Sequence, residues 1–159
     1  MAKVYYDQDA DLSNLNGKLI GIVGYGSQGH AHAQNLRDSG CKVVVASKPG
    51  GTGWKAAEAD GFKVMSVADA TKAADIITLL APDNLHASIY TESIGPNLKA
   101  GKTLMFAHGF NIHFFQIVPP KDVDVNMVAP KCPGHMMRAI YKEKAGAPAI
   151  MAVHQDVSG

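Results

Sequence analysis

Cysteine is scarce in this chain, and it contains neither a long apolar run nor an excess of charge. Its two cysteines, Cys41 and Cys132, do not form a Cys-x-x-Cys pair, which argues against a disulfide framework and a structural zinc site. No apolar run approaches the roughly 20 residues that a membrane-crossing helix needs. The first residues also lack the basic and apolar segments of a signal peptide. We therefore expect a soluble, cytoplasmic protein with reduced thiols and no membrane partner.

The balance of charges argues against a further class of partner. The net charge is only +1, and no cluster of lysines and arginines stands out. Proteins that bind nucleic acid neutralise phosphates with such clusters, so we expect no nucleic-acid partner. The 159 residues are 47% hydrophobic and 18% charged, a composition that suits one domain with a substantial core.

Apolar runs rich in β-branched residues recur along the chain with other segments between them. They predict strands at residues 19–23, 42–46, 75–80, 102–107, 125–129 and 148–153. Runs that are apolar throughout are typical of a parallel sheet covered by helices on both faces. The sequence therefore predicts an α/β fold with a doubly wound, mostly parallel sheet.

Helix signals lie between these runs. Glycines follow residues 27–39 and 54–60, as they often do at the carboxyl end of a helix. Ser66 and Asp69 resemble a capping box before a third helix, and Pro82 predicts a strand end followed by a helix at 85–90. The first sixteen residues are expected to form a short arm or helix.

A glycine-rich turn follows the first predicted strand and opens the first predicted helix. It reads Gly24-Tyr25-Gly26-Ser27-Gln28-Gly29. In such a turn Gly24 permits the tight bend, Gly26 lets the main chain approach a pyrophosphate, and Gly29 lets the helix pack on the strand. The free N–H groups of the helix then face the phosphates. A turn that only packs is the alternative, but the flanking strand and helix favour a nicotinamide dinucleotide site of the Rossmann type.

The end of the second predicted strand bears on the choice between NADP and NAD. An NAD site usually has a carboxylate there, which binds the ribose 2′-hydroxyl. Residues 46–53 contain no carboxylate, whereas Lys48 could meet a 2′-phosphate and Thr52 could donate a hydrogen bond. These residues favour NADP, and the alternative for Lys48 is an ordinary solvated lysine.

Longer stretches resemble the ketol-acid reductoisomerases, also called acetohydroxyacid isomeroreductases. They are GYGSQGHAHAQNLRDSG at 24–40, ADGFKVMSVADATKAADII at 59–77, PNLKAGKTLMFAHGFNIHF at 96–114, QIVPPKDVDVNMVAPK at 116–131, PGH at 133–135 and AVHQDVSG at 152–159. FAHGFNIHF and VPPKDVDV are highly specific, because ordinary Rossmann proteins lack them. The resemblance implies an oxidoreductase of isoleucine and valine synthesis. Such an enzyme converts 2-acetolactate into 2,3-dihydroxy-3-methylbutanoate by a magnesium-dependent alkyl shift, followed by hydride transfer from NADPH.

The resemblance also assigns roles to individual residues. His108 matches the family's active-site histidine, and Lys131 lies in a motif that approaches the active site, so both are catalytic candidates. The remaining matches are cofactor-binding candidates: Tyr25, Gly26, Ser27 and Gln28 on the pyrophosphate turn, Lys48, Gly51 and Gly53 around the 2′-phosphate, Asp83, Asn84, Leu85 and His86 near the adenosine and ribose, and Gly134 near the nicotinamide.

Four substitutions, in two parts of the chain, distinguish it from the family's pattern. The family commonly has an arginine and two serines where this chain has Lys48, Gly51 and Gly53. A lysine does not reproduce the planar fork of an arginine, so we expect relaxed selectivity between NADPH and NADH. Cys132 stands where the family usually has glycine, so its side chain is expected to hinder a close approach of the main chain near Gly134.

In the family, the acidic residues that hold two magnesium ions lie in a helical domain beyond the position of residue 159. We therefore expect residues 1–159 to be one truncated NAD(P)-binding domain without metal ligands. It would bind cofactor without turnover and meet the acetohydroxyacid substrate only together with the second domain. An open sheet edge would favour a homo-oligomer.

A different class of function is a free-standing dinucleotide-binding or regulatory module. His108 and Lys131 discriminate between the two, because a pure sensor needs neither. An unrelated dehydrogenase is a weaker hypothesis, since the chain has no Tyr-x-x-x-Lys pair on a predicted helix.

Overall fold

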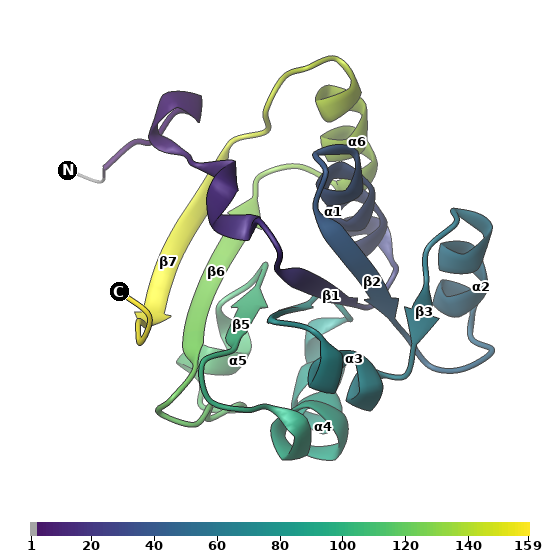
Figure 1. Cartoon of the computed structure of the whole chain (residues 1–159), viewed down its shortest axis with the longest axis vertical. Helices are drawn as coiled ribbons and strands as arrows, with labels where there is room; N and C mark the ends of the chain where they lie inside the picture. Colours follow the sequence, from purple (N-terminus) through teal and green to yellow (C-terminus); the bar gives the residue numbers. More distant parts are fainter. Residues whose placement is uncertain (1–2) are drawn as a thin grey trace.

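A computed structural model of the chain describes residues 3–159. Figure 1 shows a twisted sheet, with α1 and α6 on one side and α3 and α4 on the other. The sheet has seven strands in the order β3-β2-β1-β4-β5-β6-β7. The strands are β1 (Leu19–Val23), β2 (Lys42–Ala46), β3 (Val64–Met65), β4 (Ile76–Leu79), β5 (Thr103–Phe106), β6 (Asp124–Pro130) and β7 (Ala149–Gln155).

The pairing of these strands confirms the predicted doubly wound, mostly parallel sheet. All neighbours are parallel except β6 and β7, which are antiparallel. Each of the six predicted strands is present to within a few residues at its ends, and the two-residue β3 is an addition. The direction of β7 could not be predicted, because an apolar run carries no information about strand direction.

Helices connect most of the strands. They are α1 (Ser27–Asp38), α2 (Thr52–Ala59), α3 (Val67–Ala73), α4 (His86–Ile89), α5 (Phe110–His113) and α6 (Gly134–Lys142). Among residues 3–159, no helix is long and apolar enough to cross a membrane.

Several helix boundaries differ from the expectation. The second helix begins at Thr52 and not at Trp54, so Thr52 and Gly53 belong to its first turn. The helix expected at 85–90 is a series of short turns. A 3-10 turn at Asp83–Leu85 is followed by α4, by a π turn at Tyr90–Ile94 and by a second 3-10 turn at Gly95–Asn97. The amino-terminal arm has two 3-10 turns, at Asp7–Asp9 and Leu12–Leu15, and α5 was not predicted.

The two faces of the sheet bury separate apolar clusters. On β1 and β2, Ile22 and Val45 belong to the cluster that contains Phe62, whereas Val23 and Val44 belong to the cluster around Phe106. Successive side chains of a strand point to opposite faces, so both faces of these strands are covered. This explains why the strands are apolar throughout. Strand β7 is the exception, because six of its seven residues are exposed at the sheet edge.

Candidate cofactor site

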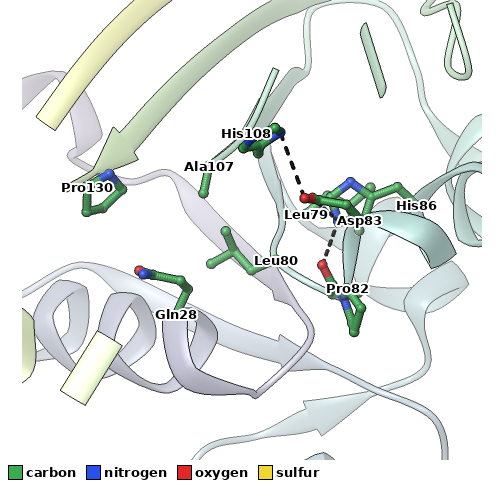
Figure 2. Close-up of a pocket in the computed structure, with 10 residues that line it drawn as sticks. Gln28, Leu79, Leu80, Pro82, Asp83, His86, Ala107, His108 and Pro130 are labelled. Atoms are coloured by element: carbon green, nitrogen blue, oxygen red, sulfur yellow. Dashed lines mark hydrogen bonds and ion pairs between the residues drawn. The ribbon is translucent and has the colours of Figure 1, made fainter. Parts of the chain in front are cut away.

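A groove crosses the carboxyl ends of the central strands, where the chain order reverses between β1 and β4. Its larger part has a volume of about 630 Å³ and lies over the glycine turn and the end of β2. Its smaller part, about 290 Å³, extends towards His108 and Pro130 (Figure 2). Gln28, Leu80, Ala81 and Pro82 line both parts. Open α/β sheets bind ligands at such a switch point.

The glycine turn shapes one wall of this groove. Gly24 has a φ of +98°, and a Cβ atom on it would lie 2.7 Å from the Ala81 nitrogen. A Cβ atom on Gly29 would overlap the carbonyl group of Gly24, whereas one on Gly26 would have no neighbour within 4 Å. Gly24 and Gly29 therefore allow the chain to pack closely. Gly26 instead leaves the main chain open on the groove side.

The amino ends of two helices face the larger part of the groove. Helix α1 begins after Gly26 and α2 begins after Gly51, and neither end has a side-chain cap. Their first N–H groups are therefore free to bind an anion, and the helix dipoles favour one. Because α2 starts two residues earlier than expected, Thr52 and Gly53 supply such N–H groups.

The loop between β2 and α2 lies beside these helix ends. Lys48 is exposed. The wall also contains Ser47, whose hydroxyl group was not predicted from the sequence to belong to the site. None of the described residues that line the larger part is an aspartate or a glutamate. The loop thus offers hydroxyl groups, N–H groups and one cation to the ligand.

Two histidines and a carboxylate surround the smaller part of the groove. The Asp83 carboxylate lies 3.8 Å from His108 Nδ1 and 3.7 Å from His86 Nε2, and Figure 2 shows it between the β4 end and His108. The Phe110 N–H donates to His108 Nδ1 at 3.2 Å. In this arrangement Nδ1 is unprotonated, and Nε2 of the exposed His108 remains available to a ligand.

His86 has a different environment from His108. It is almost fully buried, and its Nε2 donates to the Ala81 carbonyl oxygen at 2.7 Å. Burial lowers the pKa of His86 below its ordinary value, although the Ala81 carbonyl and Asp83 oppose this effect. A neutral imidazole is thus part of the wall that supports the Pro82 turn.

The segment after β6 packs directly on the start of α1. Gln28 Nε2 donates to the Cys132 carbonyl at 3.0 Å, and the Gly134 N–H donates to Ser27 Oγ at 3.2 Å. A Cβ atom on Gly134 would overlap the main chain of Ser27. Met137 of α6 lines a cavity beside α1, and the two helices pack against each other, so α6 partly covers α1.

Most of the predicted site residues come together around the groove. Its walls include Gly24, Tyr25, Gly26, Ser27, Gln28, Lys48, Gly51, Thr52, Gly53, Asp83, Leu85, His86 and His108. Gly29 and Gly134 lie behind the wall, and the exposed Asn84 and Lys131 line neither part. Sequence analysis missed Leu80, Ala81 and Ile89. Leu80 ends the predicted strand at 75–80 and Ala81 follows it directly, and this position could have indicated both.

Within residues 3–159, no three aspartate, glutamate, histidine or cysteine side chains come close enough together to hold a metal ion. The residues present do not fit a magnesium site.

Comparison with known proteins assigns this chain to a family. Residues 14–159 match the model of the acetohydroxy acid isomeroreductase NADPH-binding domain. This chain belongs to that family. It is 46% identical to an NADH-preferring ketol-acid reductoisomerase from an uncultured archean, with a TM-score of 0.96 over 99% of this chain and 49% of that one. The chain therefore spans about half the length of this reductoisomerase.

More distant structures share the fold alone. A 3-hydroxyisobutyrate dehydrogenase from Mycobacterium tuberculosis is 17% identical, with a TM-score of 0.67 over 89% of this chain and 47% of that one. A pyrroline carboxylate reductase from Plasmodium falciparum with NADP bound is 19% identical, with a TM-score of 0.66 over 91% and 51%. These structures share the Rossmann-type fold of this chain, and the family model that matches residues 14–159 is that of an NADPH-binding domain.

Proposed function

We propose that this chain is the cofactor-binding part of a ketol-acid reductoisomerase that reduces a rearranged acetohydroxyacid such as 2-acetolactate. The groove with two uncapped helix ends at one side and His108 at the other carries the proposal. The helix ends suit the phosphates and ribose of a dinucleotide, and the smaller part of the groove suits its nicotinamide. A sensor module would not need a histidine at that end.

The residues of this chain would bind and orient the cofactor, which supplies the hydride when bound. The N–H groups of α1 hold the pyrophosphate, and those of α2 hold the 2′ group of the adenosine ribose. Because Nδ1 of His108 accepts from Phe110, its Nε2 is left to donate a hydrogen bond to a substrate oxygen at the nicotinamide end. Lys131 follows β6 nearby, and its catalytic role stays a proposal. We assign no metal-dependent step to these residues, because they do not form a metal site.

The same residues support binding of both NADPH and NADH. No carboxylate of the described wall would repel a 2′-phosphate or preferentially bind a 2′-hydroxyl. Lys48 offers a single charge without the bidentate geometry of arginine. The similar archaeal enzyme is NADH-preferring. We therefore propose that the domain accepts both cofactors and discriminates less than about a hundredfold between them, or roughly 2.7 kcal/mol.

Calorimetric titration of the whole chain with NADPH and with NADH, each with and without magnesium, tests this function. Saturable binding that does not depend on magnesium is expected, because the described residues hold no metal site. No binding of either cofactor at millimolar concentration would overturn the proposal. A preference greater than a hundredfold for one cofactor would overturn only the relaxed selectivity.

Replacing Lys48 by alanine isolates the contribution of its charge. Lys48→Ala should weaken NADPH binding up to about fivefold, since an exposed ion pair contributes up to about 1 kcal/mol, and should leave NADH binding unchanged. Lys55→Ala is the matched control, because Lys55 is an exposed lysine of α2 that does not line the groove. Equal losses for both cofactors in Lys48→Ala would show that Lys48 does not contact the 2′-phosphate.

A further inference from the structure

Tyr25 lies in the glycine turn, but its hydroxyl group contacts residues outside the groove. The side chain is buried, and its ring packs edge-on against Phe62 with the ring centroids 5.7 Å apart. The same apolar cluster includes Ala57 of α2. The side chain thus runs from the pyrophosphate turn towards Phe62 and the buried side of α2.

The Tyr25 hydroxyl is bonded to the carboxyl end of α2. It donates to Asp60 Oδ2 at 2.7 Å, and Gln34 Nε2 of α1 donates to the same oxygen at 3.0 Å. Arg37 Nη1 donates to the Asp60 carbonyl at 2.7 Å. Burial raises the pKa of Tyr25 to about 12, so the hydroxyl keeps its proton at neutral pH. Asp60, the residue directly after α2, is therefore held by the glycine turn and by α1.

The amino end of α2 packs on the same tyrosine. A Cβ atom on Gly53 would lie 3.5 Å from Tyr25 Cβ and 3.7 Å from the Tyr25 nitrogen. Gly53, Ala57 and Asp60 are four and three residues apart, which places them on one face of the helix. Tyr25 therefore lies against both ends of this face, where Gly53 has no side chain and Ala57 has only a methyl group.

This contact links the two helix ends that the proposed function assigns to one cofactor. The pyrophosphate would bind α1, whereas the 2′ group of the ribose would bind α2 and the Lys48 loop. A dinucleotide fixes the separation of these two groups, so its affinity depends on the position of α2 relative to the turn. A 2′-phosphate engages the N–H groups and the dipole of α2 more strongly than a hydroxyl does.

We propose that the Tyr25 side chain is a positioning residue for cofactor selectivity. It sets the distance between the pyrophosphate turn and the amino end of α2, and thereby sets the relative affinity for NADPH and NADH. The inference rests on the proposed function, because it assumes that both helix ends bind the cofactor.

Tyr25→Phe tests the inference, since it removes the hydroxyl and keeps the ring. Calorimetry on the whole chain should show NADPH binding weakened about fivefold and NADH binding weakened less than twofold. Tyr141→Phe is the matched control, because the Tyr141 hydroxyl also lies 2.7 Å from a partner, Ser39 Oγ, but away from the groove. That variant should keep the ratio of the two dissociation constants.

Substitutions of Asp60 separate positioning from a general loss of stability. Asp60→Asn keeps a carbonyl oxygen that can accept from Tyr25, so it should retain the ratio of the NADPH and NADH dissociation constants. Asp60→Leu removes the acceptor and should shift this ratio as Tyr25→Phe does. If Tyr25→Phe and Asp60→Leu lower the unfolding midpoint but leave the ratio of the NADPH and NADH dissociation constants unchanged, the inference is overturned and the proposed function stands. No binding of either cofactor by the unsubstituted chain would instead overturn the proposed function.

Discussion

At Gly26 an added methyl group would project into open space, whereas at Gly24 and Gly29 it would collide with main-chain atoms of this chain. These three glycines look equivalent in the sequence, and their environments separate them. Gly24 and Gly29 are needed for the turn itself to form. Gly26 is not needed for packing, so its lack of a side chain serves whatever approaches from the groove.

Gly26→Ala should therefore separate folding from cofactor binding. We expect its thermal unfolding midpoint to stay within about 2 °C of the unsubstituted chain, because a surface change usually costs less than about 0.5 kcal/mol. Its affinity for NADPH and NADH should fall at least tenfold, or about 1.4 kcal/mol, because the methyl group stands where the pyrophosphate approaches. Calorimetry and thermal unfolding measure the two effects.

Two other glycine substitutions complete this comparison. Gly24→Ala should lose both stability and cofactor binding. Gly146→Ala should lose neither, because a Cβ atom on Gly146 has no neighbour within 4 Å and Gly146 does not line the groove. Unchanged cofactor affinity in Gly26→Ala would contradict the proposed approach of the pyrophosphate to this turn.

Helices α1 and α6 approach each other closely at their amino ends. The hydrogen bond from Gly134 to Ser27 and the one from Gln28 to Cys132 join the segment after β6 to the turn that would hold the pyrophosphate. Further along, Arg138 of α6 donates to Asn35 and Asp38 of α1. The position of α6 is thus coupled to the shape of the groove, although α6 follows α1 by about a hundred residues.

Gly134→Ala should push these two helices apart. Its Cβ atom would overlap the Ser27 main chain, which cannot move without disturbing the turn. Overpacking of this kind costs about 1 to 3 kcal/mol, so we expect the free energy of unfolding in urea to fall by that amount and cofactor binding to weaken. An unchanged urea midpoint would contradict this packing. Gly146→Ala, just after α6, serves as the control.

Buried histidines make the stability of the whole molecule depend on pH. The pKa values of His32 and His86 are lowered from 6.5 chiefly by burial, which disfavours the charged imidazole. In the unfolded chain both would take up protons below about pH 6.5, before the folded chain does. The unfolded state then binds more protons, and the free energy of unfolding decreases as the pH falls.

We therefore expect the thermal unfolding midpoint to be highest above about pH 7 and to decrease between about pH 6.5 and 5. Carboxylates with lowered pKa values, such as Asp124, contribute only below their ordinary 3.8. The double substitution His32→Gln and His86→Gln should flatten the decrease in this window, even if it lowers the midpoint at every pH. An equally steep decrease in the double variant would assign the effect to other groups.

Much of the fold and part of the site could be predicted because their signals are local. Apolar runs bounded by glycine and proline indicate the strands, and a glycine turn between a strand and a helix indicates the dinucleotide site. The family resemblance, which the comparisons confirm, rests on continuous stretches such as FAHGFNIHF. The start of α2 was missed by two residues, because Gly51 caps it without a side-chain signal.

Composition, strand and helix patterning and the family were thus determined by the sequence itself, because neighbouring residues carry that information. The tertiary structure decided the antiparallel direction of β7, the position of Asp83 beside His108, and the bond from Tyr25 to Asp60. These depend on how strands and helices pack between residues far apart in the chain, as the 35-residue separation of Tyr25 and Asp60 illustrates. A one-dimensional pattern does not contain such distances, since they follow from the burial of both sheet faces at once.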